Sequence, residues 1–470
     1  MSFLGYFNIY CLRVNLSVAL VAMVKNTPEI NATNSSCPYP TDNTTLQYVQ
    51  EGEFDWSTTV QGQILGAFFY GFFLTQLPGG RLAECFGGKL IFGLGVFFTA
   101  FFTVLTPVIA RWNVAALIVL RVLEGLSEGI TCPAMHYLIG SRIPKFQRST
   151  ASTFIYSGAL LGTVVSLPVS GIFCSSEFLG GWPAVFYVFG GLGCVWTVFW
   201  FIFIPNRPFE SVYKKEHIKR IPWIPILKSR VVWILAITHF GQGWGFLMLL
   251  TELPTYLSAV LHYDIQQNAL FSAIPYLFQS VTGWFCGFVA DYVYKNGYAR
   301  LNVIRKTCNT IGLHKLYTRY IGTALCLIGV VQAGCDHLIS ISFFTLAMTL
   351  NGFINSGFFV SIIDIAPDFA EYYILSTLVG ITATIAAIPG FLAPIFIGYL
   401  TEHEQTVRNW SIIYYFTAGL YILTNTIYVL FGTAELQPWG VHSFDNYKQS
   451  KDKFISPPTS ADNKAPINPD

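Results

Sequence analysis

Leu90–Ala110 reads LIFGLGVFFTAFFTVLTPVIA, a run of 21 residues without one charged side chain. A helix needs about 20 such residues to cross the hydrocarbon core of a bilayer. A membrane β-barrel would instead show segments of about ten residues with alternating polarity. Because only helices and closed barrels satisfy the backbone inside lipid, this stretch predicts a membrane-spanning helix.

The whole chain shares this apolar character. Of its 470 residues, 53% are hydrophobic and only 11% are charged, whereas a soluble domain carries about 25% charged residues. So few charges cannot cover the surface of a soluble protein of this length. The composition excludes a cytosolic enzyme, a disordered protein and a nucleic-acid binder, and it predicts an all-α polytopic membrane protein.

Similar apolar runs recur along the sequence and predict about twelve membrane helices in two sets of six. The first set lies near 3–24, 58–79, 89–110, 113–138, 149–173 and 183–204. The second set lies near 231–258, 268–291, 320–335, 338–363, 374–399 and 411–432. We therefore expect an N-terminal half over 1–204, a cytoplasmic linker over 205–230, a C-terminal half over 231–434 and a disordered cytoplasmic tail over 435–470.

The distribution of lysine and arginine predicts the orientation. Of the 27 basic residues, 18 fall in the even-numbered loops, and only Lys25, Arg111 and Arg408 fall in the odd-numbered loops. Positive residues favour the cytoplasmic side of a membrane. The even-numbered loops and both termini are therefore expected in the cytoplasm.

The first loop, residues 25–57, is consequently expected in the lumen. It carries three N-glycosylation motifs, at Asn31, Asn34 and Asn43, and such motifs are modified only on that side. Asn15 fits the same motif but lies inside the first predicted span, so we expect it to be unmodified. Cys37 and Cys174 both fall on the oxidising side and could form a disulfide, which the sequence leaves open.

The cytoplasmic ends of the second and eighth predicted spans match each other. Glu84 follows Gly80 by four residues, and Asp291 follows Gly287 by four residues. Basic residues follow in both cases, beginning with Lys89 in the first half. An acid at such a helix end can pair with a neighbouring cation in one conformation and release it in another. We therefore predict a gating role for Gly80, Glu84, Lys89 and Asp291.

Four charged residues fall near the middle of predicted spans, where each costs about 3 kcal/mol. Arg13 lies in the first span, and Arg121, Glu124 and Glu128 lie in the fourth. The spacing places the last three on one helix face. A guanidinium group binds the paired oxygens of an anion, and a buried carboxylate can carry a proton. These residues predict a proton-coupled anion site, with a static Arg121–Glu128 ion pair as the alternative.

The remaining polar candidates are weaker. Ser17 and Tyr70 lie on the first and second predicted spans and could add contacts to the substrate. The histidines and cysteines show no metal-ligand spacing. We expect no catalytic residue, no metal and no cofactor beyond the coupling ion, which is a proton or a sodium ion.

Three stretches carry a resemblance to a known family: LRVNLSVALVAMV at 12–24, FFYGFFLTQLPGGRLAECFGGK at 68–89 and RVLEGLSEGITCPAMH at 121–136. Over nearly its whole length the chain resembles solute carrier family 17, the sialin-like and sodium/phosphate-cotransporter-like anion transporters of the major facilitator superfamily. The resemblance implies the major facilitator fold, cavity arginines at Arg13 and Arg121, and a proton-linked carboxylate at Glu128. It also implies secondary transport of a small anionic solute by a monomer among membrane lipids, without nucleic acid.

Within that family the chain is most similar to the sialin branch. Glu124 stands where the vesicular glutamate branch has Gln, and Leu65 and Gln242 stand where that branch has His and Arg. The resemblance therefore implies proton-coupled symport of an acidic sugar, with sodium-coupled phosphate symport as the alternative. Ser361 and Ile362 replace the usual Asn and His of the tenth span, which keeps open a non-transporting scaffold or sensor.

The compartment is left open by the sequence. The first apolar stretch begins at Ser2, so we expect almost no cytoplasmic leader and no cleavable signal peptide. In the family this leader carries a lysosomal sorting signal. A lysosomal or vesicular membrane and the plasma membrane therefore both remain possible.

Overall fold

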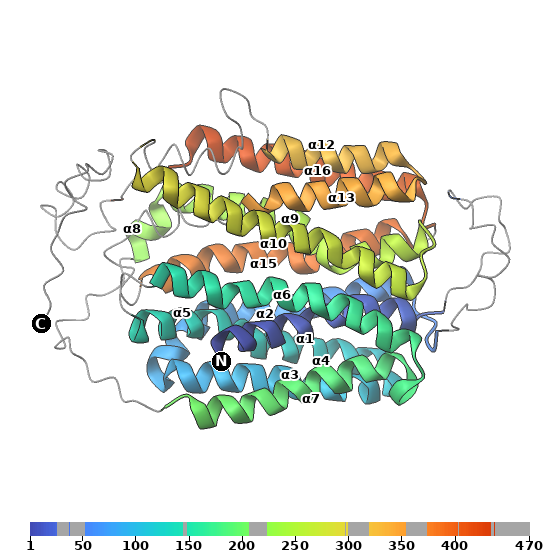
Figure 1. Ribbon diagram of the computed structural model, residues 1–470, viewed down its shortest axis with the longest axis horizontal. Helices are drawn as coiled ribbons and strands as arrows, with labels where there is room; N and C mark the ends of the chain where they lie inside the picture. The colour runs from blue at the N-terminus through green and yellow to red at the C-terminus, as the bar shows by residue number, and fades with distance from the viewer. Residues whose placement is uncertain are drawn as a thin grey trace, which may run out of the picture.

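The chain was analysed as a computed structural model, which describes residues 1–25, 37, 52–143, 148–205, 223–296, 298, 319–353, 374–402, 404–433 and 437. Nearly all of these residues are α-helical, and the long helices run side by side along the longest axis of the molecule (Figure 1).

The helices follow the predicted order of spans. The first half contains α1 (Ser2–Met23), α2 (Thr58–Phe86), α3 (Gly88–Trp112), α4 (Val114–Gly129), α5 (Thr131–Arg142), α6 (Arg148–Ser175) and α7 (Trp182–Phe203). The second contains the short α8 (Trp223–Lys228), then α9 (Arg230–Ala259), α10 (Ile265–Lys295), α12 (Arg319–Ala333), α13 (His337–Asn351), α15 (Ile374–Leu400) and α16 (Val407–Phe431). Each predicted span overlaps a described helix or, for the fourth span, a pair of helices.

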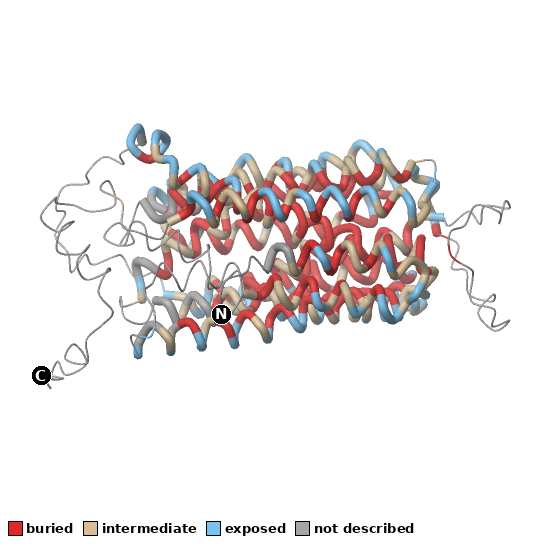
Figure 2. Tube along the Cα trace, turned by 90° about the horizontal axis from the view of Figure 1, so that it is seen from above, coloured by how far each residue is buried: buried red, intermediate tan, exposed pale blue. Residues whose placement is uncertain are grey.

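The outer surface of the bundle is apolar. Large side chains such as Trp112, Phe203 and Phe288 are exposed, and Figure 2 shows exposed residues on the outward turns with buried residues between the helices. Within the described residues, eight helices are long and apolar enough to cross a membrane, and α12 and α13 contain shorter apolar segments. The chain is therefore an integral membrane protein with multiple spans.

The second helix is longer than the sequence suggested. We expected a loop from Gly79 to Lys89, but α2 continues to Phe86 and α3 begins at Gly88. The turn between them is Gly87, with φ +89°, a conformation that glycine adopts without strain. The polar residues here mark the end of the membrane core, where a helix can continue into water.

The fourth predicted span is two helices, because the chain breaks at Ile130 between α4 and α5. Pro133 has no backbone N–H and cannot bond the carbonyl of Gly129 four residues earlier. The hydroxyl of Thr131 donates to the carbonyl of Glu128 at 2.6 Å. The break therefore places Glu128 at the end of a helix, with its carbonyl satisfied by a side chain.

The two halves meet along α2 with α15 and along α6 with α10. Near the helix ends that the sequence predicts to be luminal, the contacts are polar. The hydroxyl of Thr58 donates to the carbonyl of Gly398 at 3.0 Å, and the Gln266 amide donates to the Ser175 hydroxyl at 2.7 Å. We call the contact between the start of α2 and the end of α15 the luminal seam. These bonds hold the halves together on the luminal side.

The carboxylate of Glu402 makes a hydrogen bond across the same seam. Glu402 follows α15 and accepts a hydrogen bond at 2.7 Å from the backbone N–H of Thr59, in the first turn of α2. Hydrogen bonds from Thr59 lower the pKa of Glu402 below its usual value. The second half thus caps the N-terminus of a helix in the first half, where the helix dipole favours a negative charge.

The disulfide in the structure is not the pair that the sequence left open. Cys37 bonds Cys335, which follows α12, whereas Cys174 is buried in α6 and takes no part in this disulfide. Cys335 lies in an odd-numbered loop, which the sequence predicts to be on the same side as the first loop. It links the first luminal loop covalently to the second half.

The first luminal loop is also fixed by charge. Arg111 at the end of α3 donates to both oxygens of Glu53, at 2.8 and 3.1 Å, and the Trp182 indole donates to the same carboxylate at 3.1 Å. The Arg111 guanidinium holds the pKa of Glu53 below its usual value. The end of the loop is therefore held against α3 and α7.

Candidate functional site

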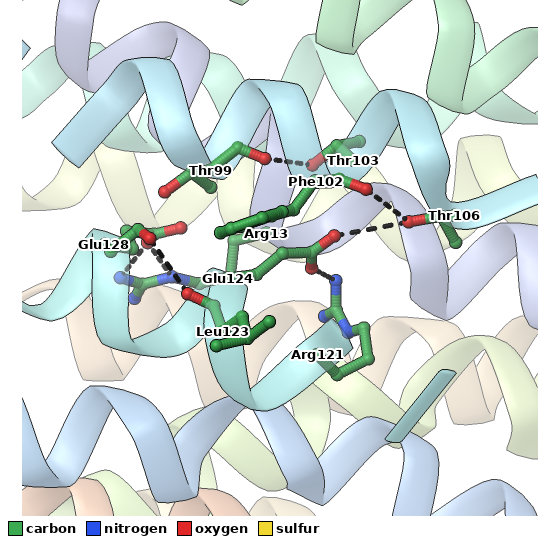
Figure 3. Close-up of polar contacts among 10 residues, drawn as sticks. Arg13, Thr99, Phe102, Thr103, Thr106, Arg121, Leu123, Glu124 and Glu128 are labelled. Carbon is green, nitrogen blue, oxygen red and sulfur yellow. Dashed lines mark hydrogen bonds and ion pairs between the residues drawn. The ribbon is translucent and has the colours of Figure 1, made fainter. Parts of the chain in front are cut away.

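The mid-membrane charges form two ion pairs. Arg13 on α1 reaches across to Glu128 on α4, with Nε donating to Oε1 at 2.7 Å and Nη2 donating to the same oxygen. The Arg13 side chain is 10% exposed and that of Glu128 is 0% exposed. Figure 3 shows this contact between the two helices. The partner that Arg13 lacks within its own helix is thus supplied by α4.

The second pair lies within α4. Arg121 donates from Nη1 to Oε2 of Glu124, one helical turn further along. The other Glu124 oxygen accepts a hydrogen bond at 3.2 Å from the hydroxyl of Thr106 on α3. The static Arg121–Glu128 pair considered from the sequence is therefore wrong for this conformation. Thr106 was missed because it lies on a different helix.

Phe68 on α2 connects the two pairs. Its ring centre lies 5.5 Å from the Arg13 guanidinium carbon and 5.3 Å from that of Arg121. Tyr10 and Phe72 also lie near Arg13, at 4.6 and 4.7 Å. Aromatic faces attract cations, so these rings stabilise the guanidinium groups in this largely buried region.

A small cavity opens beside this cluster. Its lining residues are Arg13, Val14, Ser17, Leu65, Phe68, Phe69, Arg121, Leu250 and Thr251. They come from α1, α2 and α4 of the first half and from α9 of the second half. Both arginines therefore face one cavity between the halves, as an anion site requires.

Ser17 and Tyr70 differ in position. Ser17 lines the cavity and donates to the carbonyl of Val14 at 2.7 Å. Tyr70 lies outside the lining and stacks on Phe391 of α15, with ring centres 4.5 Å apart. Its role as a substrate contact stays a prediction, and its observed contact joins the two halves.

The predicted gating residues are only partly described. Gly80 lies within α2. Lys89 donates to the carbonyl of Phe201 at 3.0 Å, near the end of α7, where the helix dipole favours a cation. The side chains of Glu84 and Asp291 lie outside the described residues, so the gating role stays a prediction.

Other predicted positions also fall outside the described residues. They are the glycosylation motifs at Asn31, Asn34 and Asn43 and the departures at Ser361 and Ile362. Asn15, which we expected to be unmodified, is buried in α1.

A polar group on the cytoplasmic side of the cluster was not predicted. The Tyr156 hydroxyl on α6 lies 2.9 Å from Nδ1 of His136 on α5, and the Cys132 sulfur lies 3.7 Å from the same nitrogen. The spacing of Cys132 and His136, one helical turn apart, is the only sequence signal for this contact. Tyr156 comes from another helix and could not be found from spacing.

Comparisons with known proteins agree with this geometry. The family model of the Major Facilitator Superfamily matches residues 2–313. The chain is 39% identical to sialin of Ovis aries, covering 95% of this chain and 91% of that protein. It is 35% identical to a putative inorganic phosphate cotransporter of Drosophila ananassae, covering 95% of this chain and 94% of that protein.

A solved structure supports the fold. The D-xylose-proton symporter superposes with a TM-score of 0.66 at 13% identity, covering 94% of this chain and 98% of that chain. The two sets of described helices, the charged cavity between the halves and these matches agree. The chain belongs to the major facilitator superfamily, among the sialin-like and phosphate-cotransporter-like members of solute carrier family 17.

Proposed function

We propose that this secondary transporter moves an organic anion, an acidic sugar of the sialic acid type, together with protons. The observation that carries the proposal is that Arg13 and Arg121 line one cavity while each is held by a glutamate. The two arginines and two glutamates sum to zero charge, so the empty cluster is neutral in a buried site.

Anion binding would disturb this balance. An arginine that turns from its glutamate to the substrate leaves that carboxylate buried without a cation. An unpaired buried charge is strongly unfavourable, so the released glutamate takes up a proton. Binding of one anion thereby favours binding of one proton, which is the linkage that a symporter needs.

Glu128 is the better candidate for this proton. Its Oε2 atom has no hydrogen-bond partner among the described residues, whereas both oxygens of Glu124 are engaged. Alternating access by rocking of the two halves would then expose the cluster to each side in turn.

The test is the Glu128→Gln variant in proteoliposomes with an imposed pH gradient and radiolabelled sialic acid. We expect the gradient to cease driving accumulation in a variant that is less stable but still folds and reconstitutes. Arg408→Gln, at a luminal helix start, is the matched control and should accumulate label normally. Gradient-driven accumulation with unchanged pH dependence in Glu128→Gln would overturn the coupling role.

Sodium-coupled phosphate symport is the second candidate, favoured by the similarity to the Drosophila ananassae cotransporter. Replacing external sodium with choline at zero pH gradient separates the two functions. Loss of labelled phosphate uptake in choline would favour the second candidate. A non-transporting scaffold or sensor would show no gradient-driven accumulation of either solute.

A further inference from the structure

One buried carboxylate lies outside the four-charge cluster and its cavity lining. Glu252 lies toward the luminal end of α9 in the second half and is 5% exposed. Its Oε1 atom has no hydrogen-bond partner, and Glu252 belongs to none of the ion pairs in the described parts of the chain. The function proposed above makes no use of it.

Glu252 lines a second small cavity, at the luminal seam. The lining residues are Thr58, Gln61, Gly62, Glu252, Thr255, Pro394, Ile397, Gly398 and Thr401. They come from α2 of the first half and, in the second half, from α9, α15 and Thr401 just after α15. Separation of α2 from α15 would therefore open this cavity to luminal water.

The groups around Glu252 give no compensating charge. The residues that α2 and α15 contribute to the lining are uncharged, and α1 and α10 contribute none. On α16, the Tyr414 phenol is close enough to interact with Glu252 electrostatically. Just beyond α15, Glu402 is itself acidic and is engaged by Thr58 and Thr59.

An ionised carboxylate in this position is unfavourable. Burial of an unpaired charge costs several kcal/mol, and such a group is more stable when neutral. When the seam opens, water can solvate the charge and the cost disappears. The closed seam therefore binds one more proton at this position than the open seam.

We propose that Glu252 is a second proton-binding site, on the second half of the protein, whose protonation is required for the luminal side to close. In the open state the Glu252 carboxylate takes a proton from luminal water and becomes a neutral carboxyl group. Closure of α2 against α15 then buries a neutral side chain. This site is separate from Glu128, which lies in the first half.

The direction of the pH effect follows from linkage. Because the closed state holds the additional proton, the ratio of closed to open molecules rises as pH falls, by up to about tenfold per pH unit. Luminal acid would thus promote closure. Glu402 acts in the opposite sense, because its charged form supports the seam.

The experiment measures closure directly, in nanodiscs, without substrate or gradient. Spin labels are introduced at positions 177 and 267, which are exposed and belong to opposite halves on the luminal side. Distance distributions between the labels are recorded from pH 7.5 to pH 5. In the unsubstituted chain we expect the short-distance population to grow as pH falls.

Glu252→Gln keeps the shape of the side chain and removes its charge. We expect this variant to show the short-distance population at every pH, whereas Glu252→Asp should retain a pH response. Glu404→Gln is the matched control, because Glu404 is an exposed carboxylate just beyond the seam, and it should respond like the unsubstituted chain.

Two outcomes would overturn the proposal. One is a pH response in Glu252→Gln equal to that of the unsubstituted chain. The other is closure that follows sodium concentration at constant pH and is lost in Glu252→Gln, which would make the site a cation site. Neither outcome bears on Glu128, because the measurement involves no transport.

Discussion

Arg13 donates two hydrogen bonds to a single oxygen of Glu128, Oε1, and Oε2 of the same carboxylate has no partner among the described residues. A guanidinium and a carboxylate can instead form two parallel bonds, one to each oxygen. The observed arrangement satisfies only half of the carboxylate. It leaves one buried oxygen available for a proton once Arg13 turns away from the carboxylate.

This pair can be tested by a double-mutant cycle on Arg13→Gln and Glu128→Gln. Each single substitution leaves a buried charge unpaired and should lower stability by about 3–5 kcal/mol. The double substitution should cost no more than either single one. Denaturant unfolding in detergent measures this, and strictly additive losses would contradict a direct pair.

Arg111→Gln provides the comparison for that cycle. It removes the ion pair with Glu53, whose side chain is 41% exposed. Exposed pairs contribute about 0.2–1 kcal/mol. A loss of stability as large as that of Arg13→Gln would mean that burial does not determine the cost of breaking an ion pair.

Phe68→Leu should weaken anion binding. The substitution removes the ring that faces both guanidinium groups, and each such contact contributes about 0.5–1 kcal/mol. The arginines should then be less well held for the substrate, and we expect the KM for the transported anion to rise about five- to thirtyfold. Initial uptake rates at varied substrate concentration give KM and maximal rate separately.

Phe92→Leu controls for the loss of packing. Phe92 is fully buried on α3, where it packs against Trp196 and Trp200. It should change stability but leave KM unchanged. An equal rise in KM for both variants would exclude a specific role for Phe68.

Glu402→Gln should weaken the luminal seam at neutral pH. Since the pKa of Glu402 is lowered in the closed form, its stabilisation is complete above the ordinary glutamate pKa and is lost as pH falls through the lowered value. Distances between labels at positions 177 and 267 should show fewer closed molecules in the variant at pH 7. Below the lowered pKa, variant and unsubstituted chain should agree. Equal closure at pH 7 would show that this hydrogen bond does not support the seam.

The disulfide predicts a simple biochemical result. A protease site inserted between Ile204 and Trp223 should yield two fragments that remain joined on a non-reducing gel, because Cys37 and Cys335 lie on opposite sides of the cut. A reducing agent should separate them. Cys335→Ser should separate them without reduction, whereas Cys174→Ser should not. Fragments of the Cys335→Ser variant that stay joined would contradict the Cys37–Cys335 pairing.

The membrane fold was predictable because hydropathy indicates directly which segments lie in lipid and which lie in water. The run from Leu90 to Ala110 and its counterparts located the described helices within a few residues at most ends. The end of α2 was misplaced because polarity at Arg81 marks the membrane boundary and does not require a helix to stop. The break at Ile130 was missed because the hydrophobic pattern of the fourth span is not interrupted by the missing backbone N–H of Pro133.

The sequence predicted which residues form the site, but it did not predict which arginine pairs with which glutamate. Arg13, Arg121, Glu124 and Glu128 stand out because charge in lipid is costly. Which cation faces which carboxylate depends on how helices rotate against each other, and a single sequence does not contain that information. The same reason explains why Cys335 was missed as the partner of Cys37.

Because of the break between α4 and α5, the charged residues on α4 need not move when α5 tilts. A continuous helix transmits any tilt of its cytoplasmic end along its whole length. At Ile130 the chain can bend without losing a bond to the Gly129 carbonyl, because Pro133 has no N–H to donate to it. α5 can therefore change its tilt while Arg121, Glu124 and Glu128 on α4 keep their mutual spacing. One arrangement of charges can then serve both sides of the membrane.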